Sequence, residues 1–504
     1  MASAPRGNLD DFNSPTLFGS EIMDGSDTDP TCSPVYQCIA CALGSLRGSA
    51  ESWICNQCTT SYPIAGGLPV FVRRPYRLVE AGEATAQATR AHAQRFAESG
   101  ASRFSERHSR AAHAMIENLS LIDATSSLDS RSKRRRQSRA EALLDELSST
   151  HYGWSLDELL PYFHQDWAGR SDVQDVVDLI SRALNKSVPD REAVVVLGAA
   201  GCGLLYALAR QFDWAYGVDL SLHGLALARR VLDGEEVKAY LRMAAWRPMN
   251  IRRSAGEQSN IRLLIADAVS LPFESASQSA VVTQYLMDAV SNPWAVIDEI
   301  ARVLKPGGIW VNFSLPFRLP DEPVGCGRPD IDELAAALAA RELAVVESAN
   351  VRFSPLDVSG LDSGTMTVNQ SVQFFLARRA PMSAAAVPRH ELHDARWWRS
   401  TPRIARGRSV EIASALAFSA AGVSSSRCMR MQGAVGSFEV ARCAEEDQQT
   451  MEAVLHAIDG QRSHREIQES LATQALLFDD RQYGELMYYL SRRDGLIVTD
   501  LKQF

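Results

Sequence analysis

The chain has 504 residues, of which 46% are hydrophobic and 22% charged, so we expect about three globular domains and not a largely disordered protein. Its formal net charge of −9 disfavours a nucleic-acid partner, because an acidic molecule repels phosphates. No apolar run reaches the ~20 residues that span a bilayer, and the first residues lack the apolar core of a secretory signal. These features predict a cytoplasmic protein that binds neither nucleic acid nor membrane.

Two cysteine pairs dominate the N-terminal part of the chain. Residues 1–34 are rich in Ser, Asp, Pro and Gly and are predicted to be disordered. The next segment, 35–74, holds two C-x2-C pairs separated by thirteen residues, namely Cys38, Cys41, Cys55 and Cys58. Two such pairs can direct four thiolates at one ion, which matches the tetrahedral preference of Zn²⁺ better than a redox pair. Cys32 lies outside this spacing.

The sequence TTSYPIAGGLPVFVRR follows the second pair. Together with the cysteines, it resembles the small zinc ribbons that are fused or docked to methyltransferases. This resemblance covers 35–74 and implies a structural zinc ion that supports a neighbouring domain, not a catalytic metal.

Residues 75–169 are rich in Ala, Arg, Glu and Ser and are predicted to be helical. The basic run RSKRRRQSR at 131–139 could bind phosphate, but in an acidic chain we interpret it as a solvated segment.

From residue 192 onward, apolar β-branched segments alternate with amphipathic helices. This alternation predicts a doubly wound α/β sheet over about 170–380. The expected strands lie within 193–203, 215–221, 260–273, 279–290, 309–317, 344–354 and 371–379, and the expected helices are 171–188, 204–212, 222–234 and 292–308.

Polar and glycine residues follow the carboxyl ends of these strands, where such sheets bind ligands. A glycine-rich turn after the first strand contains Gly198, Gly201 and Gly203. Its small residues let backbone N–H groups approach a ligand. Further candidates at strand ends are Asp219 with Leu220, Asp267 with Ala268, and Gln284. The first carboxylate could accept both ribose hydroxyls of an adenosine and the second its amino group, although both could merely cap helices.

These pieces, followed by LKPGG and a further strand, resemble in this order the class I S-adenosylmethionine (SAM) methyltransferases. The resemblance covers about 190–315 and implies a Rossmann-like sheet with SAM as the cofactor. A nicotinamide dehydrogenase fits less well, because D-A-x-x-L-P-F before L-K-P-G-G is typical of methyltransferases.

A closer resemblance, to the carnosine N-methyltransferase family, rests on SAVVTQYLMDAVSNPWAVIDEIARVLKPGGIWVN at 279–312. HQDW (164–167) and TVNQSVQFFLARR (367–379) add weaker similarity. The chain departs from that family by an alanine in the glycine-rich turn, by an aspartate at Asp219 where the family has glutamate, and by lacking the dipeptide-pocket His and Tyr residues.

We take Asp288 as the catalytic candidate, because a carboxylate at a strand end can orient an imidazole or amine and hold its proton. A helix cap or a buried hydrogen-bonding aspartate is the alternative for this residue. The candidate substrate residues are Tyr285, Asn292, Phe313, Asp166 and Trp167.

The C-terminal third no longer shows the alternation of strands and helices, and a linker is expected over 381–439. Ser463 is predicted to cap a helix, and 478–500 reads as a helix followed by a short hairpin. I-D-G-x-R-S-x-x-E-I resembles winged-helix modules such as the PqqD-like peptide-binding domains. It implies a mainly helical domain over 440–504 that holds a peptide or protein partner, with a packing or dimerisation module as the alternative.

The leading hypothesis is a SAM-dependent N-methyltransferase that acts on a His-containing dipeptide or a related small peptide or amine. The acceptor could instead be a protein, a ribosomally made peptide or a secondary metabolite, which the C-terminal module favours. A non-catalytic peptide- or protein-binding scaffold is the hypothesis of another class, and the intact glycine turn and strand-end aspartates disfavour it.

Overall fold

The computed structural model describes fourteen stretches of the chain, and the statements below concern these stretches alone. They are 35–99, 105–123, 138–149, 156–167, 171–242, 246–253, 256, 258–317, 328–353, 370–380, 395–405, 429–432, 437–440 and 445–499. The chain divides into two units, Met1–Val35 and Tyr36–Phe504, and the second carries every element described here. The predicted tail and most of the basic run lie outside the described residues. No described helix is both long and apolar enough to cross a membrane.

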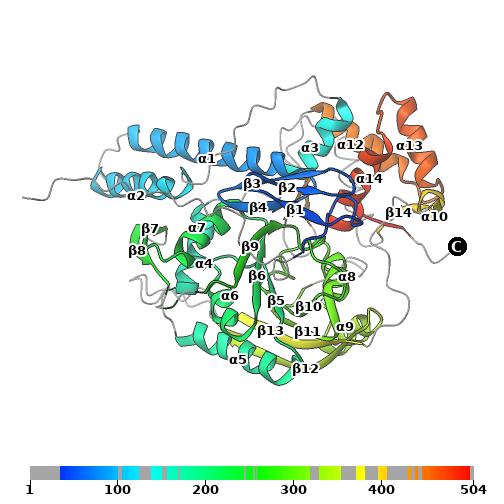
Figure 1. Ribbon diagram of the computed structural model, residues 1–504. Coiled ribbons are helices and arrows are strands. Elements are labelled where there is room, and N and C mark those ends of the chain that lie inside the picture. Colours follow the sequence, from blue (N-terminus) through cyan, green and yellow to red (C-terminus); the bar gives the residue numbers. More distant parts are fainter. Residues whose placement is uncertain are drawn as a thin grey trace, which may run out of the picture. The chain divides into compact units, whose positions relative to one another are not determined.

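A twisted sheet with helices on both faces forms the centre of the second unit (Figure 1). Its central strands run in the order β9-β6-β5-β10-β11, all parallel, followed by β13, which is antiparallel to β11 and β12. The bounds are β5 Ala193–Leu197, β6 Trp214–Asp219, β9 Ile261–Ala266, β10 Gln278–Gln284, β11 Leu304–Ser314, β12 Leu343–Phe353 and β13 Gln370–Arg379. The predicted α/β sheet is therefore confirmed.

Alternating side chains of the buried strands pack into two separate hydrophobic cores, one on each face of the sheet. Val194 and Val196 of β5 pack into one core, and Val195 and Leu197 pack into the other. This period of two arises because successive side chains of a strand point to opposite faces. The first core is covered by α5 Ser171–Ser187, α6 Gly203–Leu208 with the short η1 Ala209–Gln211, and α7 Leu222–Leu232, and the second by α8 Pro293–Val303 and α9 Ile331–Ala339.

The helix predicted over 292–308 ends five residues early, at Val303. Leu304 already has extended backbone angles and opens β11. Lys305 precedes Pro306, and a residue before proline is disfavoured in the helical region, so LKPGG begins the next strand.

The cysteine-bearing segment is part of the main sheet, which the sequence did not indicate. Its four strands are β1 Leu46–Gly48, β2 Ser52–Cys55, β3 Ser61–Ala65 and β4 Leu68–Phe71. They form an antiparallel ladder, and β4 pairs in parallel with β9, with Val70 opposite Ile265 and Phe71 opposite Ala266. Phe71 is fully buried and packs 5.2 Å from Tyr36, measured between ring centroids. The segment of β1 to β4, called the ribbon below, therefore extends the sheet to eleven strands.

Four helices lie in the described part of 75–169, the segment expected to be helical. They are α1 Pro75–Glu98, α2 Ser105–Asp123, α3 Arg139–Ser149 and α4 Leu156–Trp167. The hairpin of β7 Val237–Arg242 and β8 Trp246–Ile251 was not predicted. It contacts α2, where the Asn118 side chain donates to the Tyr240 carbonyl and accepts from its N–H at 2.9 and 2.8 Å.

The C-terminal part is mainly helical. Its elements are α10 Ala395–Arg399, β14 Pro402–Ile404, β15 Met429–Gln432, β16 Ser437–Val440, α12 Glu445–Ala457, α13 His464–Thr473, α14 Asp480–Met487, the π-helical η3 Tyr488–Arg493 and β17 Ile497–Thr499. Ser463 caps α13 in a capping box with Glu466, which confirms that prediction. The predicted terminal hairpin is wrong, because β17 pairs antiparallel with β14 of the expected linker.

Candidate cofactor site

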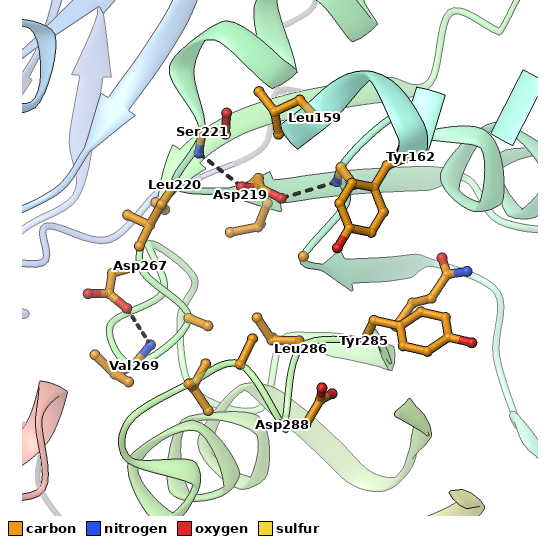
Figure 2. A pocket seen from close by; sticks show the side chains of 18 of the residues that line it. Leu159, Tyr162, Asp219, Leu220, Ser221, Asp267, Val269, Tyr285, Leu286 and Asp288 are labelled. Atoms are coloured by element: carbon orange, nitrogen blue, oxygen red, sulfur yellow. Dashed lines mark hydrogen bonds between the residues drawn. The ribbon is translucent and has the colours of Figure 1, made fainter. Parts of the chain in front are cut away.

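A cavity of about 490 Å³ lies at the carboxyl ends of the central strands (Figure 2). This volume is within the range of small-molecule sites. Its wall includes these predicted residues: Gly198, Asp219, Leu220, Asp267, Ala268, Gln284, Tyr285, Asp288 and Asp166. The strand ends therefore bring together most of the candidate residues, although they are spread over more than a hundred positions of sequence.

The glycine-rich turn serves two different purposes. Gly198 has a φ of +70°, lies on the cavity wall and needs its freedom because other residues rarely adopt this region. Gly201 and Gly203 lie behind the wall, against α4. A Cβ at Gly201 would come within 2.7 Å of Oδ2 of Asp166, and one at Gly203 within 2.6 Å of its Cβ. We predicted all three glycines as cofactor-binding; Gly198 lies on the cavity wall, and Gly201 and Gly203 pack against Asp166 of α4.

Ala200, in the middle of the glycine-rich turn, has a φ of +45°. The turn thus keeps a left-handed backbone at this position despite the side chain, at a cost of order 1 kcal/mol. The observed backbone aims the Ala200 N–H at the next feature of the site.

Asp219, at the end of β6, is held by the backbone of its own neighbourhood. Its Oδ2 accepts from the Ala200 N–H at 3.1 Å and its Oδ1 from the Ser221 N–H at 2.9 Å. Burial raises the pKa of this carboxyl, and the two N–H donors oppose that rise. Each oxygen retains a second lone pair, so the carboxylate can still accept from a ligand hydroxyl.

Helix α4 contributes a wall that the sequence reasoning largely missed. Asp166 accepts from the Gly203 N–H at 2.9 Å, and burial raises its pKa to about 7. Trp167 does not line the cavity, and its indole N–H donates to the Gly201 carbonyl at 2.8 Å. Leu159 and Tyr162 also reach the cavity wall from this helix. Their helical spacing was visible in the sequence, but nothing in it indicated which helix faces the sheet end.

Asp267, after β9, is contacted by residues far away in the chain. Its Oδ1 accepts from the Val269 N–H at 3.1 Å. The Tyr488 hydroxyl lies 3.5 Å from Oδ2, and Nε of Arg493 lies 3.7 Å from the same oxygen. Arg493 is a cavity-lining residue that no local motif marks.

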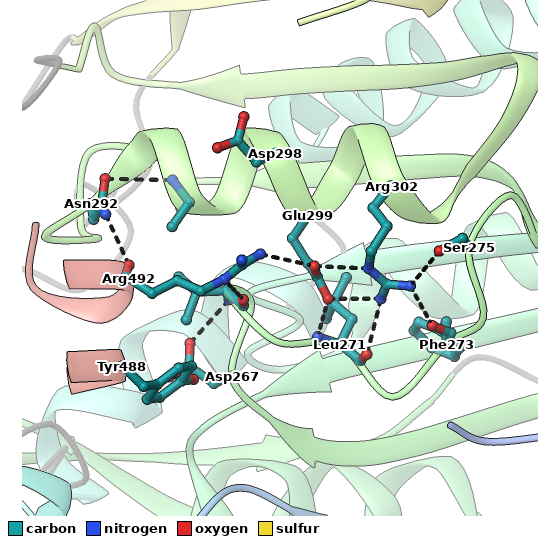
Figure 3. A network of polar contacts seen from close by, with 12 residues as sticks. Asp267, Leu271, Phe273, Ser275, Asn292, Asp298, Glu299, Arg302, Tyr488 and Arg492 are labelled. Carbon is teal, nitrogen blue, oxygen red and sulfur yellow. Dashed lines mark hydrogen bonds and ion pairs between the residues drawn. The ribbon is translucent and has the colours of Figure 1, made fainter. Parts of the chain in front are cut away.

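The C-terminal segment is attached to α8 by a buried polar network (Figure 3). Glu299, with 0% of its side chain exposed, accepts from Arg302 at 2.7 Å and from Arg492 at 3.2 Å. It also accepts from the Leu271 N–H at 2.7 Å. A buried carboxylate with this many donors is strongly fixed, and so are its partners.

Asn292 does not lie on the cavity wall, contrary to our expectation of a substrate residue. Its side chain caps α8 by accepting from the Ala295 N–H at 3.4 Å. The amide donates to the carbonyls of Ser491 and Arg492, both at 2.9 Å. The residue joins α8 to the C-terminal segment.

The end of β10 forms the opposite side of the cavity from Asp219 and Asp267 (Figure 2). Tyr285 has a φ of +50°, an uncommon conformation for a bulky residue and one that clusters at functional sites. Burial raises the pKa of Asp288, and its buried Oδ1 has no hydrogen-bond partner among the described residues. Phe313, predicted as a substrate residue, is fully buried edge-on to Tyr285, with 5.7 Å between ring centroids, and is not among the residues that line the cavity.

The four predicted cysteines form one cluster. Their sulfur atoms lie within 4.8 Å of one another, with Cys38 3.6 Å from Cys58 and Cys41 3.6 Å from Cys55. A Cβ at Gly44 would come within 2.4 Å of Sγ of Cys55, so the first knuckle needs glycine there.

Comparisons with known proteins agree with this geometry over part of the chain. Residues 195–312 match a family model described as a methyltransferase domain. The demethylmenaquinone methyltransferase of Clavibacter sepedonicus is 35% identical over 99 residues, which are 19% of this chain. The chain spans only 38% of the length of that curated relative.

Solved structures of low identity also match. A Haloferax volcanii complex that contains the Trm112 methyltransferase activator gives 17% identity and a TM-score of 0.32, over 45% of this chain and 99% of that one. Geranyl diphosphate C-methyltransferase from Streptomyces coelicolor gives 15% identity and a TM-score of 0.28, over 42% of this chain and 84% of that one. From the sequence matches and the strand-end site, we conclude that this chain contains a class I SAM-dependent methyltransferase domain.

Proposed function

We propose that this chain transfers a methyl group from SAM to a nitrogen atom of a small peptide or amine, with a His-containing dipeptide as the acceptor to test first. The supporting observation is one cavity that has two carboxylates suited to adenosine on one side and Asp288 on the other. The match to a methyltransferase domain supports the cofactor, and the resemblance of 279–312 supports the acceptor.

The residues present fit the cofactor. SAM, when bound, supplies a methyl group on a cationic sulfonium. Asp219 keeps lone pairs for the ribose hydroxyls, and Asp267 can accept from the adenine amino group. The turn at Gly198 brings the backbone to the cavity wall, which allows close approach of the ligand.

Asp288 is proposed to orient the acceptor and to take its proton. A neutral amine can donate an N–H to this carboxylate while the lone pair of the same nitrogen attacks the methyl carbon. A neutral imidazole donates its N–H to the carboxylate and attacks with its other ring nitrogen, and in both cases the carboxylate takes the proton that the acceptor loses. Because burial raises its pKa, Asp288 acts as a base only once the pH exceeds that raised value. The methylation rate should therefore rise with pH through the pKa of Asp288.

The first experiment is calorimetric titration of S-adenosylhomocysteine into the wild-type protein, followed by transfer of labelled methyl from SAM to β-alanyl-histidine. We expect micromolar binding and labelled dipeptide, with at least a tenfold lower rate and no acidic limb in Asp288→Asn. Binding without transfer to any dipeptide would reject this acceptor and direct the screen to longer peptides. An absence of binding by the folded protein would favour the scaffold hypothesis.

We also propose that the cysteine cluster holds a structural zinc ion. Tetrahedral Zn–S bonds of about 2.3 Å place sulfur atoms about 3.8 Å apart, which is close to the separations found. The purified protein should contain one zinc per chain, measured by elemental analysis, and Cys55→Ser should lower both zinc content and melting temperature. A protein that melts at the same temperature with and without zinc would reject a structural role.

A further inference from the structure

Three segments that are distant in sequence meet at Asp267. Arg73 follows the last strand of the ribbon, β4, and its guanidinium carbon lies 4.0 Å from the centre of the Tyr488 ring. The Tyr488 hydroxyl in turn lies 3.5 Å from Asp267, and Arg493 approaches the same carboxylate from the following turn. Because β4 pairs with β9 up to Ala266, the ribbon and Asp267 are also joined through the sheet.

The C-terminal segment that carries Tyr488 and Arg493 is fixed from the ribbon side. Arg74 contacts Glu485 of α14 at 2.6 Å and Asp145 of α3 at 2.5 Å, and these side chains are less than a fifth exposed. Arg493 itself is only 6% exposed, and its Nη1 lies 3.4 Å from the Leu147 carbonyl of α3.

The same segment is fixed from the α8 side. Arg492 lies 3.2 Å from the buried Glu299, and Asn292 donates to two carbonyls of the last turn. Partners on both sides therefore hold Arg493 in place beside the cavity before any ligand binds.

The side chains of Asp267 and Arg493 together suit one edge of adenine. A carboxylate only accepts hydrogen bonds and a guanidinium only donates them. Adenine carries an amino donor next to a ring-nitrogen acceptor, whereas hypoxanthine carries the reverse pattern of a carbonyl and a ring N–H. The Oδ2 of Asp267 has its protein contacts at the long distances of 3.5 and 3.7 Å, so it retains capacity for a ligand donor.

Resting on the proposed function, we propose that the C-terminal segment completes the cofactor site. Arg493 contacts the adenine base together with Asp267, and Tyr488, held by Arg73, is a positioning residue for that carboxylate. On this proposal, the C-terminal domain is required for SAM binding and sets its selectivity for adenine.

The test compares S-adenosylhomocysteine with S-inosylhomocysteine by calorimetry in the full-length protein. Arg493→Met keeps the length of the side chain and removes its donors. We expect about tenfold weaker binding of the adenosyl ligand and a several-fold smaller preference for it over the inosyl ligand. Tyr488→Phe should give a two- to threefold loss in the same direction. Arg465→Met, a C-terminal arginine placed over Trp398, is the matched control and should change neither quantity.

The outcomes separate the two proposals. Wild-type protein that binds neither ligand would overturn the proposed function and this inference together. Normal binding by the wild type, with unchanged affinity and base preference in Arg493→Met and Tyr488→Phe, would overturn the inference alone. If Arg493→Met melts at a much lower temperature, Tyr488→Phe and Arg73→Met carry the test, because a general loss of stability does not change the ratio of two affinities.

Discussion

Asp219 ends β6, Asp267 follows the neighbouring parallel strand β9, and both face one cavity, yet they are held in different ways. Asp219 accepts from two backbone N–H groups, both within 19 residues of it in the chain. Asp267 has one local N–H donor, and its other contacts, Tyr488 and Arg493, come from the C-terminal domain more than 220 residues later.

The difference shows that one cofactor site can combine two halves. The local half is Asp219 with donors near it in the chain, and the assembled half is Asp267 with Tyr488 and Arg493 from the C-terminal part. The Asp219 half forms wherever the strand–turn–helix unit forms. The Asp267 half is complete only when the ribbon, α3 and the C-terminal helices have docked. Single substitutions can therefore test separately what the Asp219 half and the Asp267 half each require.

Removing the anchor of the assembled half should have the largest effect. Glu299→Ala leaves Arg302 and Arg492 without their buried carboxylate, so we expect a loss of about 3–5 kcal/mol in the free energy of unfolding. Denaturant titration measures it. The neighbouring Asp298→Ala is the control, because its ion pair with Arg341 is 52% exposed on the aspartate side and is worth less than ~1 kcal/mol. Equal losses in the two variants would contradict this view of Glu299.

Breaking the local half should act on binding. Asp219→Ala removes the acceptor proposed for the ribose and frees the Ala200 N–H, so we expect about 100-fold weaker binding of S-adenosylhomocysteine, or ~2.7 kcal/mol. Calorimetry measures it, with the exposed Asp178→Ala as the control. Affinity within threefold of wild type would remove Asp219 from the site.

Asp166 gives a pH-dependent effect. Its pKa rises from 3.8 to about 7 on folding, so the folded state binds more protons and stability falls as pH rises through that window. The slope is at most ~1.4 kcal/mol per pH unit. Asp166→Asn can still accept from the Gly203 N–H and should flatten the slope, as measured by denaturant titrations at several pH values. An unchanged slope would show that Asp166 titrates normally.

Ser463→Ala should have the smallest effect. It removes the cap of α13, which is worth about 1 kcal/mol, while no residue of α13 is among those that line the cavity. Melting temperature should fall slightly and the affinity for S-adenosylhomocysteine should not change. A matching drop in affinity would show that the assembled half depends on the whole C-terminal domain and not only on its last turns.

Much of the methyltransferase domain was predictable because its signals are local. The run AVVVL followed by a glycine turn, the aspartates after β6 and β9, and the paired cysteines each indicate their structure within about twenty residues. Asn292 and Phe313 were predicted less well. Both occur at strand or helix ends near the site, but whether such a side chain faces the cavity or a neighbouring element depends on packing.

The sequence by itself determined the alternating sheet, the cysteine cluster and the order of the strand-end carboxylates, since hydrophobic period and turn chemistry act between near neighbours. The tertiary structure alone decided that β4 continues the sheet beside β9 and that Tyr488 and Arg493 reach Asp267. Those contacts join residues about 200 or more positions apart. They depend on which buried surfaces fit together, and no local pattern encodes that.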